Sequence, residues 1–198
     1  RPGRWPSPTM GCGAECQFNA GRPDLRPPAG LVVLSHCEDA DMVKNYAVNE
    51  GRISRQLGIP GRPAIAEEIM VMRDAMLAEE TQTAVHICHI STGRAVDIVR
   101  KYKKKGVKIT CETCPQYFTL NQSEILKQGP WPGSTRPCAP PGTWRRCWRA
   151  EGRHHRLYRH RPRPHSEEEK ARGLEQAPSG MVGLETSLAV SLTQLYHT

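Results

Sequence analysis

Residues 84–91, which read AVHICHIS, are the stretch from which the rest of the chain can be interpreted. They form a short apolar run between two segments of helical periodicity, as is typical of a buried parallel strand. Two histidines, His86 and His89, interrupt the run. A buried strand carries histidine either as a core residue with satisfied ring nitrogens or as a ligand at the strand's C-terminal end. The run alone leaves both readings open.

The segments around this run repeat the same order of strand and helix. An apolar run at 31–34 ends in the polar cluster SHCED at 35–39, and a third apolar run lies at 107–111. Helical spacing over 64–80 and 92–105 predicts two helices between the runs. We therefore expect an α/β fold with a parallel sheet and right-handed crossovers, because strands and helices alternate along the chain.

The helix expected at 64–80 has large apolar residues at helical spacing, and we expect this face to pack on the sheet: Ile65, Ile69, Met72 and Met76. Glu67 and Glu68 fall in its first turn, where they favour the helix dipole. The polar, turn-rich residues 40–63 predict a long loop with short helical pieces. A leucine stripe over 183–195 predicts a helix near the C-terminus.

Composition indicates that the folded part is only a portion of the 198 residues. Hydrophobic residues make up 37%, and there are 17 prolines. The net charge of +8 comes from one segment, since residues 130–165 carry nine arginines against one acid. We divide the chain into irregular residues 1–30, a folded part at 31–129, an Arg/Pro-rich segment at 130–164 without regular packing, and a C-terminal segment at 165–198.

Eight cysteines raise the question of disulfides or zinc. No signal-peptide or transmembrane run is present, so we expect a reducing cytoplasm and no membrane partner. Cys111 and Cys114 form a CxxC, but the downstream Cys138 and Cys147 do not form a second one. This spacing disfavours a zinc ribbon.

Five strings of the sequence are informative together: SHCED at 35–39, NEGRISRQLGIPGRPAIAEE at 49–68, HICHIS at 86–91, ETCP at 112–115 and HSEEEKARGLEQAPSGMVGLETSL at 165–188. With these strings in this order, the chain resembles the dihydroorotases of the amidohydrolase superfamily. Members of that family are (β/α)₈ barrels about twice this length. The resemblance therefore implies a partial (β/α)₈ TIM-type barrel, its C-terminal half, with irregular flanking segments.

The resemblance also implies a site. In that family two zinc ions activate a water that attacks the ring amide of dihydroorotate, and the reverse reaction closes carbamoyl-aspartate. The resemblance places metal ligands at His36 and His89, and substrate contacts at His165, Ser179 and the backbone of Gly180. His89 is preferred to His86 because residues three apart on a strand face opposite sides and the later one lies nearer the active rim. We expect the His36 and His89 rings to lie close together at that rim.

The chain departs from the family pattern at the positions that matter most for catalysis. No HxH occurs anywhere, Ser179 stands where Phe is usual, and HRPRPH at 160–165 replaces TDHAPH, whose Asp is the zinc ligand and general acid/base. Allowed codons for residues 153–164, read one nucleotide later, encode GIIDCIATDHAP. Residues 4–12, shifted by two nucleotides, similarly encode VAFSDDGL, which resembles the family's fourth strand. We therefore assign no catalytic residue, and expect the chain as written to be inactive.

Other functions stay open. Another cyclic amidohydrolase, such as a dihydropyrimidinase or allantoinase, is the near alternative. A basic RNA-binding module is suggested by the nine arginines of 136–163 with Trp144, Trp148 and Tyr158 among them. We do not expect nucleic-acid binding, because the same stretch decodes to an enzyme motif. A non-catalytic scaffold is a third class, and a homodimer is left open.

Overall fold

The computed structural model of the chain describes residues 32–43, 48–129, 155–158, 164–174, 176–178 and 180–196. Our expectations for residues 1–30 and for most of 130–164 lie outside these ranges. Within them, no helix is both long enough and apolar enough to cross a membrane.

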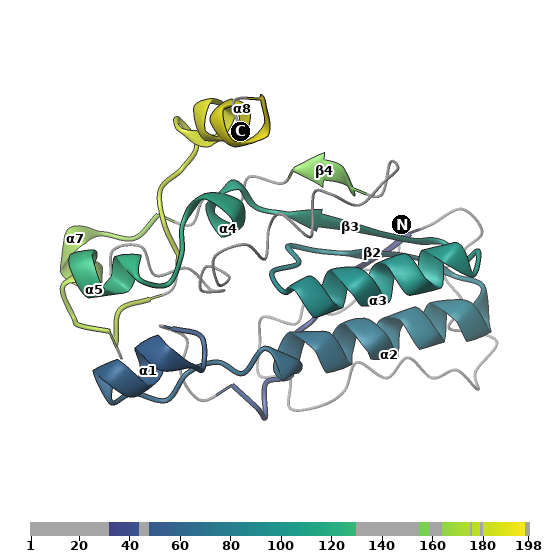
Figure 1. Cartoon of the computed structure of the whole chain (residues 1–198), viewed down its shortest axis with the longest axis horizontal. Helices are drawn as coiled ribbons and strands as arrows, with labels where there is room; N and C mark the ends of the chain where they lie inside the picture. Colours follow the sequence, from purple (N-terminus) through teal and green to yellow (C-terminus); the bar gives the residue numbers. More distant parts are fainter. Residues whose placement is uncertain are drawn as a thin grey trace, which may run out of the picture.

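A parallel sheet forms the centre of the described fold (Figure 1). Its strands follow the order of the chain, β1-β2-β3-β4: β1 Val32–Ser35, β2 Ala84–Ile87, β3 Ile109–Thr113 and β4 His155–Tyr158. Every neighbouring pair is parallel. The first three strands lie where the apolar runs predict them, so the predicted parallel α/β arrangement is confirmed.

The fourth strand corrects one expectation. We predicted no regular packing for 130–164, yet His155–Tyr158 within that segment pairs with β3, with an irregularity in register between Cys111 and Glu112. Arginine and histidine flank these residues. They hide the apolar run or alternation by which a strand is recognised in a sequence.

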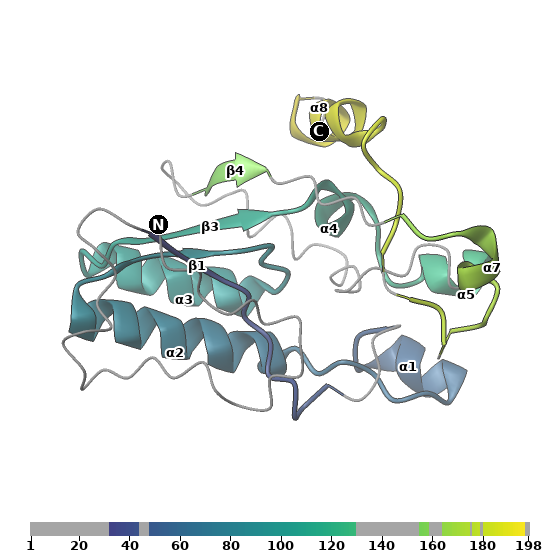
Figure 2. The same cartoon turned by 180° about the vertical axis from the view of Figure 1, so that it is seen from behind.

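Two helices, α2 (Ile65–Thr81) and α3 (Gly93–Lys104), lie side by side over one face of the sheet (Figures 1 and 2). The Thr92 hydroxyl caps α3 by accepting the Ala95 amide at 3.2 Å. The main core lies between these helices and the sheet, and its fully buried members include Val71, Ala75, Ile87, Val96 and Ile109. Both helices match the predicted ranges within one residue at each end.

The buried face of α2 differs from the predicted one. Ile65, Ile69 and Met76 are exposed by 41%, 41% and 56%, and so do not form the packed face. The helix instead buries mainly small residues: Ala66, Val71, Ala75 and Ala78. Small side chains let α2 lie close to both β2 and α3, which it contacts, so size outweighs hydrophobicity in choosing the face.

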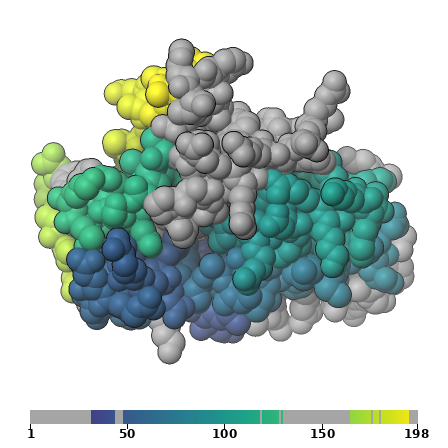
Figure 3. All heavy atoms as spheres, viewed as in Figure 1, coloured from purple at the N-terminus to yellow at the C-terminus, as the bar shows by residue number. Residues whose placement is uncertain are grey.

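Short helices surround the C-terminal end of the sheet. They are α1 (Arg52–Leu57), α4 (Pro115–Thr119), α5 (Glu124–Gln128) and α7 (Glu167–Lys170). A second apolar cluster joins α1 and α5 through Val48, Ile53 and Ile125, with Leu174 from the C-terminal segment against it. The surface view shows α1 in blue directly against α5 in green (Figure 3). The predicted helix at 183–195 is confirmed as α8 (Ser187–Tyr196), which begins four residues later.

We predict that the core between α2, α3 and the sheet governs stability. Ile87→Val, which removes one methyl group from a fully buried side chain, should lower the free energy of unfolding by about 1 kcal/mol. Ile69→Val makes the same chemical change at an exposed position of α2 and should change it by less than about 0.5 kcal/mol. Urea denaturation of the two variants, followed by circular dichroism, measures both values. Equal losses would contradict the assigned buried face.

Candidate metal and substrate site

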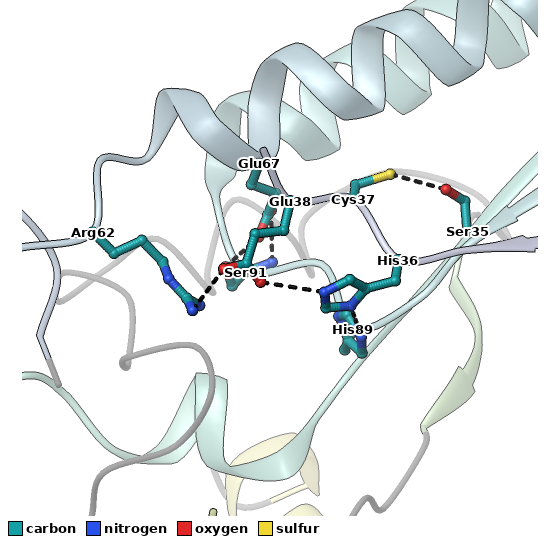
Figure 4. Close-up of polar contacts among 8 residues, drawn as sticks. All are labelled: Ser35, His36, Cys37, Glu38, Arg62, Glu67, His89 and Ser91. Atoms are coloured by element: carbon teal, nitrogen blue, oxygen red, sulfur yellow. Dashed lines mark hydrogen bonds and ion pairs between the residues drawn. The ribbon is translucent and has the colours of Figure 1, made fainter. Parts of the chain in front are cut away.

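His36 and His89 meet at the C-terminal ends of two neighbouring strands. Ser35 pairs with Ile87 in the β1–β2 register, and the Cys88 amide donates to the Ser35 carbonyl at 2.9 Å, which extends the pairing past the strands. His36 Nδ1 lies 2.8 Å from His89 Nε2, and the ring centroids are 4.7 Å apart in an edge-to-face arrangement (Figure 4). The expected closeness of the two rings is confirmed.

The backbone of His89 is turned at the end of its strand. Its φ of 42° lies in the left-handed region, which costs a residue with a Cβ about 1–2 kcal/mol. The next residue rejoins the sheet, since the Ile90 amide donates to the Glu112 carbonyl at 2.8 Å. This turn lets the buried His89 ring reach across to His36. Backbone strain of this kind is concentrated at functional sites in proteins.

A buried ion pair fixes the other side of the His36 ring. His36 Nε2 lies 3.2 Å from Glu38 Oε2, and Glu38 Oε1 lies 2.8 Å from Arg62 Nη2 (Figure 4). The Glu38 carboxylate therefore orients the imidazole so that Nδ1 faces His89. A carboxylate behind a histidine ring is the usual support of a metal-binding histidine.

Arg62 reaches this position through a close approach of two loop segments. The Arg62 amide donates to the Val48 carbonyl and the Glu50 amide donates to the Arg62 carbonyl, both at 2.8 Å. A Cβ on the preceding residue, Gly61, would lie 2.4 Å from the Glu50 nitrogen. A glycine is therefore required at position 61 for the loop to bring Arg62 into contact with Glu38.

Glu67 of α2 holds the loop that follows His89. One carboxylate oxygen accepts hydrogen bonds from the amides of Ser91 and Thr92 at 2.9 and 3.0 Å. The other accepts one from the Ser91 hydroxyl at 2.5 Å, and Figure 4 shows Glu67 beside Ser91. The sequence pattern assigned Glu67 only a favourable interaction with the helix dipole. Its burial and three hydrogen bonds show that it anchors the turn between His89 and α3.

The two histidines have the chemistry of a zinc half-site. Neutral imidazole nitrogens are preferred zinc ligands, and two nitrogens on one tetrahedral zinc lie about 3.3 Å apart. The observed 2.8 Å between His36 Nδ1 and His89 Nε2 is shorter by about half an ångström, which a small rotation of the more exposed His36 ring supplies. The pair fits as two ligands of a metal ion and leaves the other ligands to be supplied elsewhere.

The predicted substrate residues lie in the C-terminal segment. His165 Nδ1 is 3.3 Å from Glu169 Oε2, where Ser166 and Glu169 form a capping box at the start of α7. The buried Lys170 donates its ammonium to the Pro178 carbonyl at 3.0 Å, and burial lowers the pKa of Lys170. This contact fixes the backbone two residues before the buried Gly180. Ser179 lies outside the described residues.

The structure thus brings two of the predicted site residues together, gives a local contact for His165 and buries Gly180. The residues that support the pair, Glu38, Arg62 and Glu67, were not predicted as site residues. One signal was available in the sequence, since acidic residues followed the first apolar run at its C-terminal end. Nothing in the spacing of Arg62 or Glu67 indicates their contacts, because Arg62 depends on how the 40–63 loop folds back and Glu67 on how α2 packs beside the loop after His89.

The sequence of this chain is similar to those of known proteins. A profile of the family described as Dihydro-orotase-like matches residues 28–95. The dihydroorotase of Pelotomaculum thermopropionicum is 40% identical over 84% of this chain, and that of Acetivibrio thermocellus is 41% identical over 83%. The chain is a relative of the dihydroorotases. It spans about two fifths of their length, 39% in both cases.

Solved structures of hydantoinases share this fold. An L-hydantoinase (dihydropyrimidinase) from Arthrobacter aurescens superposes with a TM-score of 0.71, at 21% identity, over 85% of this chain and 39% of its own. A D-hydantoinase superposes with a TM-score of 0.68 over 82% of this chain. The predicted resemblance to the dihydroorotases is therefore confirmed by the sequence comparison. The predicted α/β fold is confirmed by the structure.

We predict that Glu67 determines the order of the loop after His89. Glu67→Gln replaces the charged acceptor of two amides and should lower the free energy of unfolding by about 1–3 kcal/mol. The Ser91 and Thr92 amides should also exchange their protons faster with solvent. Glu80→Gln, an exposed position of the same helix, is the matched control. Unchanged exchange at both amides in the Glu67 variant would show that the carboxylate does not hold the loop.

Proposed function

We propose that this chain is the C-terminal part of a dihydroorotase-type zinc hydrolase, with His36 and His89 as metal ligands. The observation that carries the proposal is the 2.8 Å approach of their ring nitrogens at adjacent strand ends. Active sites of parallel α/β folds gather at this end of the strands. The sequence identity of about 40% to dihydroorotases supports the same assignment.

We further propose that the sheet is one arc of a (β/α)₈ barrel. Among the described residues, α2 and α3 cover one face of the sheet, and β1 exposes Val32 and Leu34 by 51% and 62%. Apolar side chains on a strand require a covering layer. Preceding strands of a longer chain, closing around that face, would supply it, in agreement with the share of the relatives that this chain spans.

The proposed substrate is dihydroorotate, hydrolysed to carbamoyl-aspartate, with the reverse reaction serving pyrimidine biosynthesis in the cytoplasm. Bound zinc, two ions in a complete site, lowers the pKa of a water and polarises the ring carbonyl. His36 and His89 would hold that metal, Glu38 and Arg62 would keep the His36 ring in place, and His165, Ser179 and Gly180 would contact the substrate.

A dihydropyrimidinase or hydantoinase is the near alternative. The structural likeness to hydantoinases rests on 20–21% identity and supports the fold alone. The identity to dihydroorotases is about twice as high, which favours dihydroorotate as the ring that is opened. The RNA-binding hypothesis concerns residues 136–163, which lie almost entirely outside the described ranges.

The chain as written is proposed to be catalytically incomplete. A catalytic zinc takes about three protein ligands and keeps one position open, and a binuclear site needs bridging or additional carboxylates. The chain offers two histidines at the proposed site, and neither the HxH motif nor TDHAPH is present in its sequence. The missing Asp would also move the proton to the leaving nitrogen, a role worth about a hundredfold or more in rate.

We predict no measurable dihydroorotate hydrolysis by this chain. The assay follows loss of dihydroorotate absorbance with added zinc. Restoring TDHAPH alone should leave the rate at background, because the first-strand ligands are still missing. Restoring both shifted segments and adding the upstream half of a dihydroorotase should give turnover that His89→Ala abolishes.

Two results would decide against this account. Turnover by the unmodified chain that disappears with His89→Ala would show that the ligand count is wrong. A restored, folded protein that opens hydantoin or dihydrouracil but leaves dihydroorotate intact would identify the near alternative as the correct function.

A further inference from the structure

A second group of metal-ligating side chains lies within the sheet, apart from the His36–His89 pair. His86 and Cys88 point to one side of β2 and its extension, and Glu112 points to the same side of β3. Their ligand atoms all lie within 4.8 Å of one another. Val85, Ile87, Ile109 and Cys111 alternate with them and pack in the core against the helices. The three residues therefore face away from α2 and α3.

The register of the strands explains why these residues meet. His86 lies beside Thr110 and Ile87 beside Cys111, so the next residue, Cys88, lies beside Glu112. All three side chains are largely buried, with Glu112 exposed by only 2%. The pairing of β2 with β3 thus also brings the His86 imidazole, the Cys88 thiol and the Glu112 carboxylate together in one buried cluster.

The contacts of His86 prepare its ring for a metal. Nδ1 lies 2.7 Å from the Thr110 hydroxyl, and Nε2 lies 3.3 Å from Glu112 Oε2. When Nδ1 carries the ring proton and donates it to Thr110, Nε2 offers its lone pair toward Glu112. A second hydrogen bond of this kind fixes the tautomer of metal-binding histidines.

These contacts leave part of the Glu112 carboxylate without a hydrogen-bond partner among the described residues. Its Oε1 atom is buried and has no hydrogen-bond partner among the described residues. Among the described residues its contact with a basic side chain is with His86 Nε2, and no lysine or arginine of the described ranges forms an ion pair with it. A buried carboxylate oxygen without a partner is costly, and a cation is the group that would satisfy it.

We infer that His86, Cys88 and Glu112 form a second metal site, for a divalent ion of the zinc or cobalt class. A nitrogen, a sulfur and a carboxylate oxygen are ligands that Zn²⁺ and Co²⁺ accept together. Ligands of one tetrahedral ion lie about 3.3–3.8 Å apart, so closure from 4.8 Å requires side-chain shifts of about 1 Å. On binding, the Cys88 thiol releases its proton to solvent.

Cobalt titration of the full chain tests the site by a signal that is independent of catalysis. A thiolate bound to Co²⁺ gives a charge-transfer absorption band in the near ultraviolet. We expect this band in the wild-type chain and its loss in Cys88→Ser. Glu112→Gln should weaken cobalt binding about tenfold or more, and Thr110→Val, which removes the support of His86, by about tenfold.

Two controls separate this site from others. Cys114→Ser alters a buried cysteine outside the cluster and should keep the band, which matters because the chain has eight cysteines. The double variant His36→Ala and His89→Ala removes the ligands of the proposed catalytic metal and should also keep it. The proposal is overturned if wild-type protein with a folded circular dichroism spectrum gives no band, or if the band survives Cys88→Ser. Loss of the band in either control variant would overturn it as well. A buried His86–Glu112 ion pair without metal would then explain the cluster.

Discussion

The pairing of β1 with β2 is the constraint on which the candidate site depends. The two strands are 49 residues apart in sequence, from Ser35 to Ala84, and are parallel, so their C-terminal ends meet at one edge. The hydrogen bond from Cys88 to Ser35 carries the pairing one step past β2. His36 and His89 directly follow the paired residues, so both rings lie at this edge. Burial of Ile87 and Ile109 beneath α2 and α3 stabilises that pairing.

Polar side chains from α2 complete this arrangement. Asp74 accepts hydrogen bonds from Ser35 and Cys37 on either side of His36, and Glu67 accepts those from Ser91 and Thr92 after His89. One helix therefore holds both strand ends through buried carboxylates. Glu38 contacts the His36 ring, and Arg62 pairs with Glu38. Buried polar side chains thus hold both strand ends and the His36 ring in place.

Much of the fold was predictable because its signals are local. Short apolar runs and helical spacing determine β1 to β3, α2 and α3, and the position of a histidine after each of two strands predicts that the rings meet. The face that α2 buries was not predictable in this way, since its Ala-rich side is weaker in hydrophobicity than Ile65, Ile69 and Met76. Arg62 and Glu67 depend on long-range contacts, and β4 is concealed by its charged neighbours. The second cluster follows from register, which a sequence alone does not specify.

The most direct measurement of the central claim is a nuclear Overhauser experiment on the full chain with labelled histidine. The ring protons of His36 and His89 should give a mutual cross-peak, because their centroids are 4.7 Å apart. His36→Gln and His89→Gln variants assign the signals. A cross-peak that disappears in each variant is the result that this account predicts. Folded protein without it, or with His36 near His86 instead, would contradict the parallel pairing that places the site.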